Sequence, residues 1–158
     1  MILRSLDRAI DWLVAVAKWL ALPLIVLLFL QWPLRDIVRG WSREANDVGQ
    51  VAFALFVAMS VTAATRAHTH LAADLVAQRY SQRTRAWLAR AGAAFGLLPW
   101  AAFVIFASRS SVVSSLRIHE NFPDSGNPGY FLVKLALWLM ASAVICQSLV
   151  DIFRGDQR

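Results

Sequence analysis

Long apolar runs separated by short polar segments make up most of the sequence. Four runs stand out, and they cover residues 12–32, 48–65, 87–108 and 130–153. A helix needs about 20 apolar residues to cross the ~30 Å hydrocarbon core of a bilayer. The pattern therefore predicts an all-α integral membrane protein, in which a single domain (1–158) contains four transmembrane helices.

The first apolar run resembles a signal peptide in its place near the N-terminus, but not in its detail. A signal peptide has a shorter apolar core that is followed by small residues at a cleavage site. This run ends in Gln31-Trp32-Pro33 instead. We therefore expect it to be retained as a helix, with a kink at Pro23.

The connectors between the runs are polar but patterned. Leu34, Ile37, Val38 and Trp41 follow one another at helical spacing, with charged residues opposite them. A second amphipathic stretch, strongly basic, extends from Arg66 to about residue 85. Both stretches predict short helices that lie in the membrane interface. Residues 121–129, rich in Pro, Gly, Asn and Asp, predict an irregular turn.

Composition supports a membrane protein. Hydrophobic residues make up 58% of the chain and charged residues only 16%, whereas soluble domains average about 45–50% apolar residues. The formal net charge of +6 fits the excess of Lys and Arg on the cytoplasmic side of membrane proteins. We therefore expect contact with membrane lipid and no nucleic-acid partner. The single cysteine, Cys146, excludes a disulfide within the chain.

The distribution of basic residues predicts the orientation. Four helices would place both termini and the connector between the second and third runs on one side. That side carries eight basic residues in its flanks and the other carries five. The eight are Arg4, Arg8, Arg66, Arg79, Arg83, Arg85, Arg154 and Arg158; the five are Arg35, Arg39, Arg43, Arg109 and Arg117. The bias predicts cytoplasmic termini.

The densest group of chemically distinctive side chains follows the second run. His68, His70 and Asp74 are metal-ligand types, and His70 and Asp74 would share one face of a helix. A metal site needs three or four ligands in a defined geometry, and no further cluster lies nearby in the sequence. We interpret the group as polar residues that fix a helix end, and expect no metal, cofactor or catalysis. The alternative is a free-standing membrane protein, a small transporter or an enzyme, that uses these three residues.

The apolar cores themselves contain no Asp or Glu. Ion-coupled transporters commonly carry an acidic residue inside a span, so the sequence argues against transport by this chain alone. Gly92 and Gly96 form a GxxxG pattern, which lets two membrane helices approach closely. Trp41 and Glu44 form a Trp-x-x-Glu pair just before the second run, where an interfacial Trp and an acid near a helix N-terminus are both favourable.

Two ordered motifs carry a resemblance to a known family. Trp41-x-x-Glu44 precedes the second run, and Arg66-x-x-x-His70-x-x-x-Asp74 follows it. In a four-helix chain of this length, the order resembles the small membrane (permease) subunit of TRAP transporters, the DctQ-like family, from about residue 30 to 153. The chain departs from the common pattern after Glu44, where it reads Ala45-Asn46-Asp47.

The resemblance implies a three-part transporter in the bacterial inner membrane. In such systems a periplasmic substrate-binding protein delivers a solute, often a carboxylate, to a large membrane subunit that binds substrate and sodium. The small subunit would brace the scaffold of the large one without a transport site of its own. On this interpretation Trp41, Glu44, Arg66, His70, Asp74, Gly92 and Gly96 are structural or interface residues.

Overall fold

The computed structural model describes residues 2–37, 43–66 and 80–153 of the chain. Within these ranges almost all of the backbone is helical, and the sole extended feature is an isolated antiparallel bridge between Asn121 and Pro128. The elements are α1 (Ile2–Asp36), α2 (Arg43–Arg66), α4 (Gln82–Gly92), a π-helical turn η1 (Ala93–Leu97), α5 (Leu98–Arg117) and α6 (Tyr130–Phe153). The prediction of an all-α protein is confirmed.

The described helices have the length and composition of membrane spans. Three continuous helical segments, Arg43–Arg66, Gln82–Arg117 and Tyr130–Phe153, are long and apolar enough to cross a bilayer. A shorter apolar stretch, Trp19–Leu30, lies within α1. The class of multi-pass membrane protein is thereby supported, while a total of four spans stays a prediction.

The predicted helix boundaries are accurate for α6 and too short elsewhere. α6 occupies residues 130–153 as expected, whereas the segment predicted as 48–65 begins five residues earlier, at Arg43. The first helix runs over Ile2–Asp36 rather than 12–32, and the third over Gln82–Arg117 rather than 87–108. Polar residues extend these helices because each added residue completes one more backbone hydrogen bond once a helix exists.

The interfacial helix expected between the first two runs is not a separate element in its described part. Leu34–Asp36 continues α1, and α2 already includes Arg43–Asp47. Helical bonding passes through Pro33, whose carbonyl accepts from the backbone N–H of Ile37 at 2.9 Å. The helical interpretation is thus confirmed for residues 34–36, but these residues form the end of a longer helix. Residues 38–42, including Trp41, lie outside the described part.

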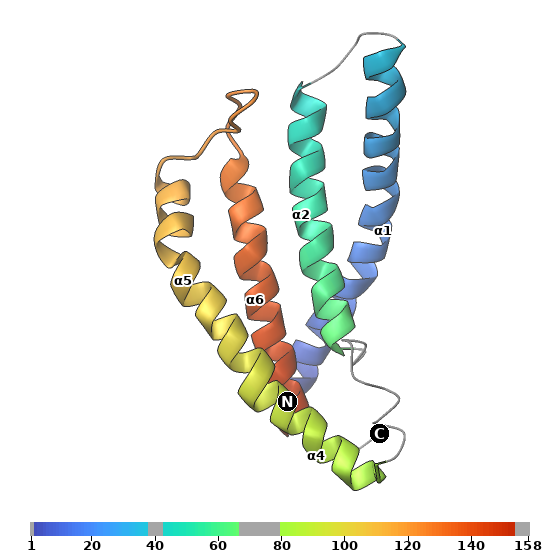
Figure 1. Cartoon of the computed structure of the whole chain (residues 1–158), viewed down its shortest axis with the longest axis vertical. Helices are drawn as coiled ribbons and strands as arrows, with labels where there is room; N and C mark the ends of the chain where they lie inside the picture. Colours follow the sequence, from blue (N-terminus) through green and yellow to red (C-terminus); the bar gives the residue numbers. More distant parts are fainter. Residues whose placement is uncertain (1, 38–42, 67–79, 154–158) are drawn as a thin grey trace.

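The helices form a bundle in which α6 packs against α1, α2 and α5. Figure 1 shows α2 and α6 side by side, with the start of α1 and the ends of α2 and α6 gathered at the lower end. We call this the terminal end, and the opposite one, where residues 118–129 connect α5 to α6, the loop end. The buried centre consists of small side chains, Ala101, Ala141 and Val144. Small residues let membrane helices approach closely, as predicted for this chain.

The third segment is bent out of the bundle. The backbone N–H of Leu98 bonds to the carbonyl of Ala93, five residues back, which makes a π turn just before Pro99. Proline lacks an N–H and its ring displaces the carbonyl four residues earlier, and a wide turn relieves that clash. Beyond the turn, α4 buries none of its residues and extends past the other helices at the terminal end (Figure 1).

Candidate functional site

The structure describes four of the seven predicted interface residues. Glu44 lies exposed in the first turn of α2, and Arg66 is its half-buried last residue. Gly92 and Gly96 are also described. Trp41, His70 and Asp74, together with His68, lie outside the described residues, so the Arg66-x-x-x-His70-x-x-x-Asp74 motif is seen only at its first position.

Arg66 links α2 to α1 at the terminal end. Its guanidinium lies 2.7 Å from the carboxylate of Asp11, and the arginine side chain is 17% exposed while that of Asp11 is 59% exposed. Because Asp11 is mainly in solvent or headgroups, the Coulomb energy of the pair is screened. On α6 at the same end, the amide of Gln147 donates to Asp151 at 2.9 Å. The Arg66–Asp11 pair therefore joins α2 to α1, whereas the Gln147–Asp151 bond lies within α6.

A layer of buried polar residues lies between α2 and α6 near this end. The hydroxyls of Thr62 and Thr65 donate to carbonyls one turn back in α2, at 2.9 and 2.8 Å. Gln147 and Ser148 of α6 are fully buried as well. Hydroxyl and amide side chains can join membrane helices where a charged residue would be too costly. Among the described residues the layer holds no ionisable group, so it serves helix packing.

The GxxxG pattern does not mediate packing between the helices that the structure describes. A Cβ atom added to Gly92 or Gly96 would meet nothing within 4 Å, and both residues are exposed. Gly96 lies inside the π turn that precedes Pro99. Any close helix approach over these glycines would have to come from outside the described residues.

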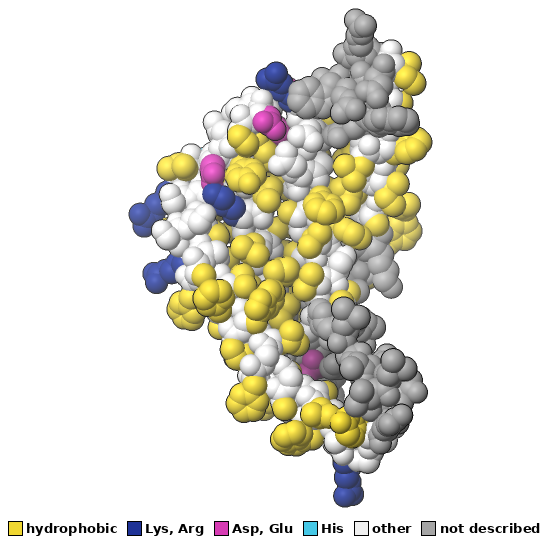
Figure 2. Space-filling view, in the orientation of Figure 1, with side chains coloured by type: hydrophobic (Ala, Val, Ile, Leu, Met, Phe, Trp, Pro, Cys, Tyr) yellow, Lys and Arg dark blue, Asp and Glu magenta, His cyan; other side chains and the backbone are white. Residues whose placement is uncertain are grey.

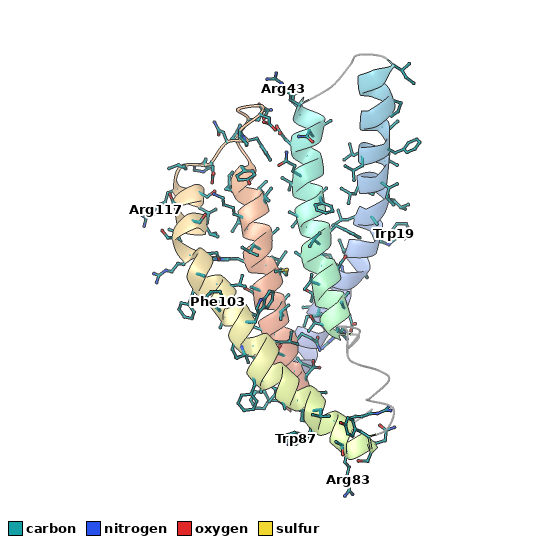
Figure 3. All side chains as sticks on the ribbon, viewed as in Figure 1. Trp19, Arg43, Arg83, Trp87, Phe103 and Arg117 are labelled. Carbon is teal, nitrogen blue, oxygen red and sulfur yellow. The ribbon has the colours of Figure 1, made fainter. Side chains whose placement is uncertain are left out.

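The richest polar constellation is at the loop end. Asp47 of α2 is only 5% exposed, and its Oδ2 accepts from the hydroxyl of Ser125 at 2.5 Å and from the amide of Asn127 at 3.3 Å. The guanidinium of Arg43 donates to the carbonyl of Asp124 at 3.2 Å. Figure 3 places Arg43 at the upper end of α2, beside the loop that precedes α6. The loop is therefore fastened to α2 through two side chains.

A second polar pair joins the loop to α6. The ammonium of Lys134 lies 2.5 Å from the carboxylate of Glu120, and it also lies over the ring of Tyr130, 5.5 Å from its centroid. The Lys134 hydrogen bond holds the pKa of Glu120 below its ordinary value of 4.5. The loop carboxylate is thus kept ionised, and its charge balances the one lysine that lies inside the first turns of α6.

The loop is irregular and turn-rich, as predicted, and it is also compact. Phe122 is buried and packs edge-on against Tyr130. Its backbone N–H bonds to the carbonyl of Asn127 at 2.8 Å, and its carbonyl accepts from Gly126 at 2.9 Å. Gly126 and Gly129 have φ values of +74° and +141°, which glycine adopts without steric cost. The result is an ordered platform over the first turns of α2 and α6.

Sequence reasoning identified the loop but not its anchors. Asp47 was counted as one of several flanking acids, and Lys134 as a lysine at a helix end. The usable signal was the Asp-Ser-Gly-Asn-Pro-Gly run, whose short polar side chains favour local hydrogen bonds. Nothing in the local sequence shows that Asp47, 78 positions away, provides the acceptor for Ser125.

The described residues contain no group of three or more His, Cys, Asp or Glu side chains that could hold a metal ion. The polar constellation at the loop end can position a loop and present a surface.

Comparison with known families gives one match. A family model described as "Tripartite ATP-independent periplasmic transporters, DctQ component" matches residues 24–158, which is most of the chain. No curated protein and no solved structure matches it. The matched range includes α2, α4, α5, α6 and the loop-end platform. The chain belongs to the DctQ family, a membrane component of the tripartite ATP-independent periplasmic (TRAP) transporters.

Proposed function

We propose that this chain is the non-catalytic small permease subunit of a sodium-driven TRAP transporter in a bacterial inner membrane. It would brace the scaffold of a large membrane subunit that binds sodium and the solute, which we expect to be a carboxylate. A periplasmic substrate-binding protein would be the third component. Both termini would be cytoplasmic, with four spans in all, and the chain would need no cofactor of its own.

The observation that carries this proposal is the family match over residues 24–158. The geometry supports a bracing role in two ways. The described clusters of polar side chains fasten helices or the loop, as Asp11 to Arg66 and Asp47 to Ser125 do. The stretch of α2 after Asp47 and the stretch of α6 before Asp151 contain no Asp or Glu, whereas ion-coupled transporters commonly carry an acidic residue inside a span.

The orientation proposal gives the loop end a role. With cytoplasmic termini, the platform of residues 118–129 would face the periplasm and lie within reach of the substrate-binding protein. Its ordered backbone would allow it to dock with little loss of conformational entropy.

Co-expression with a candidate large membrane subunit of the TRAP type tests the proposal. We expect a tagged copy of the chain to retain the large subunit through affinity and size-exclusion chromatography. Liposomes containing both chains and the binding protein should take up solute only when a sodium gradient is present. Sodium-dependent uptake by this chain alone, or failure to retain the large subunit, would refute the bracing role.

The predicted interface motif gives a sharper version of this experiment. We expect His70→Ala or Asp74→Ala to lower the yield of the complex severalfold while the content of bound metal in the purified chain stays at background. His119→Asn is the matched control, because His119 lies exposed at the loop end and Asn tolerates its φ of 48°. A stoichiometric metal in the wild-type chain that His70→Ala removes would instead support the alternative of a metal-dependent membrane enzyme.

A further inference from the structure

The upper part of α5 is polar at a depth where its neighbours are apolar. The indole N–H of Trp138 donates to the hydroxyl of Ser108 at 2.9 Å, so these two residues lie at the same level in the bundle. Trp138 is two turns, about 12 Å, inside the first residue of α6. Arg109 follows Ser108 directly. The segment from Arg109 to Arg117 therefore runs beside the first two turns of α6.

The other helices are apolar at that level. Val51 and Leu55 of α2 and Leu132 and Leu135 of α6 line an apolar groove together, which places both helices in an apolar environment there. Among the described residues at this height, Lys134 of α6 is charged but paired with Glu120, whereas α5 exposes two arginines and two serines, Arg109, Ser110, Ser114 and Arg117. The continuous helix from Gln82 to Arg117 has 36 residues and is about 54 Å long, so it is much longer than the ~30 Å hydrocarbon core.

The outward face of this segment contains a shallow hollow. The hollow has a volume of about 420 Å³ and is lined by Arg109, Ser110, Val113, Ser114, Arg117 and Ile118. Its polar groups are two guanidinium groups and two hydroxyls, and α5 contains no acidic residue. Figure 2 shows basic side chains at the edge of the molecule over the upper part of α5.

No carboxylate of the described chain satisfies these arginines. The nearest acid in the sequence, Glu120, is engaged by Lys134, and neither Arg109 nor Arg117 has a partner among the described residues. An arginine that faces the membrane without a counter-charge is costly. An anionic group from outside the described residues would supply that counter-charge.

The surface below the hollow indicates which anionic group it is. Phe103 and Phe106 are 68% and 75% exposed, and they lie on the same face of α5 as Ser110, seven and four residues before it. Figure 3 shows Phe103 and Arg117 projecting from the same outer side of the helix. One face thus presents exposed aromatic rings and, just above them, two arginines and two serines. A phospholipid has the same order, with acyl chains below a phosphate.

We propose that the hollow lined by Arg109, Ser110, Ser114 and Arg117 binds the phosphate of a phospholipid headgroup, with the acyl chains lying over Phe103 and Phe106. Arginine and serine donors match the oxygens of a phosphate diester. A phosphate held between Arg109 and Arg117 would lie about 6 Å below the start of α6. The bilayer beside α5 would therefore be locally thinner where this lipid is bound. The bound lipid would also fix the tilt of α5.

Native mass spectrometry of the full-length chain with added phosphatidylglycerol tests this site. We expect the wild-type chain to retain one tightly held lipid, and Arg109→Gln/Arg117→Gln to weaken its retention about tenfold or more, since two charge-assisted contacts are lost. Arg83→Gln/Arg90→Gln removes the same charge from α4 at the other end of the helix and should leave retention unchanged. An equal loss in both double variants would show general electrostatic attraction and would overturn the site.

Two further arms distinguish other occupants. Glycerol 3-phosphate at millimolar concentration should not displace the lipid; if it does, the hollow binds a free phosphate ester rather than a lipid. The lipid should also remain in the complex with the large subunit. The large subunit could instead expel the lipid and form a crosslink with Ser110→Cys. In that case this face of α5 is a protein interface and the lipid site is refuted.

A photoreactive phosphatidylglycerol with the wild-type chain makes the test independent of any variant. Labels from the acyl chain should map to the peptide that contains Phe103 and Phe106. Labels spread evenly over all exposed apolar helix faces would contradict a defined site.

Discussion

At the scale of single residues, Gly129 shows how tightly the loop end is built. Its φ is +141°, and a Cβ atom there would lie 3.0 Å from Cε2 of the buried Phe122 ring. We expect Gly129→Ala to lower the free energy of unfolding by about 1–3 kcal/mol, because both the backbone conformation and the space disfavour a side chain. Denaturant unfolding in detergent micelles measures this loss.

Gly92→Ala is the matched control for that substitution. Gly92 has φ of −61°, and nothing lies within 4 Å of an added Cβ atom. Alanine should be neutral there or stabilise the helix by up to about 1 kcal/mol. If both variants lose the same stability, the strain assigned to Gly129 is wrong.

Asp47 is the residue on which the loop depends for its attachment to α2. Asp47→Ala leaves the Ser125 hydroxyl and the Asn127 amide without their acceptor, so we expect a loss of about 1–3 kcal/mol in the free energy of unfolding. Asp47→Asn keeps one acceptor oxygen and should lose less. Thermal unfolding followed by circular dichroism gives the comparison, and Asp124→Asn, an exposed loop carboxylate, controls for the change in charge. Equal stability of the wild-type and Asp47→Ala chains would show that the loop is held by other contacts.

The residue scale is also where the sequence was least informative. Helical spacing cannot show that Asp47 meets Ser125, because their contact joins segments 78 positions apart. In the sequence Asp47 appears as part of the departure from the family pattern after Glu44, whereas the structure leaves it 5% exposed. A residue at the start of a helix can be buried by a loop that folds over it, and the periodicity of the sequence does not predict such a contact.

At the scale of elements, the apolar runs predicted the helices well and their ends poorly. α6 was predicted from residue 130 to residue 153 because turn-forming residues precede it and charged residues follow it. α2 and α5 extend into polar sequence, where hydropathy falls but helical hydrogen bonding continues. The sequence does not predict the π turn at Ala93–Leu97, because Pro99, two residues after it, indicates only that the helix bends there. Hydrophobicity determines which residues enter the membrane, and backbone hydrogen bonding determines where each helix ends.

The pairing of the α5–α6 loop with α6 should make stability depend on pH. The Lys134 hydrogen bond lowers the folded-state pKa of Glu120 from 4.5. The ionised Glu120 therefore contributes fully to the free energy of unfolding above about pH 4.5, and this contribution is lost as pH falls through the lower folded-state pKa. We expect the unfolding temperature of the wild-type chain to fall in this acidic range more than that of Glu120→Gln. The two chains are compared by thermal unfolding from pH 7 to pH 3. Parallel curves would exclude Glu120 as the source of the acid sensitivity.

At the scale of the whole molecule, the bundle buries little of its apolar surface by itself. Its buried hydrophobic residues are mainly Ala and Val, while large side chains on the outside of α1, η1 and α5 are more than two-thirds exposed, such as Trp19, Phe29, Phe95 and Phe106. Lipid can cover such faces, since tails are as apolar as the side chains. A bracing subunit would additionally bury one of these faces against the large membrane subunit.

Binding of the large subunit should therefore stabilise the chain measurably. A partner that binds only the folded chain adds about 2.7 kcal/mol of stability when its free concentration is 100 times the Kd, and this raises the unfolding temperature by several degrees. We expect the intrinsic fluorescence or circular dichroism of the co-purified complex to show a later transition for this chain than the isolated chain shows in the same detergent. The isolated chain mixed with an unrelated membrane protein of similar size is the control. An unchanged transition in the complex would mean that the two chains share too little surface for one to brace the other.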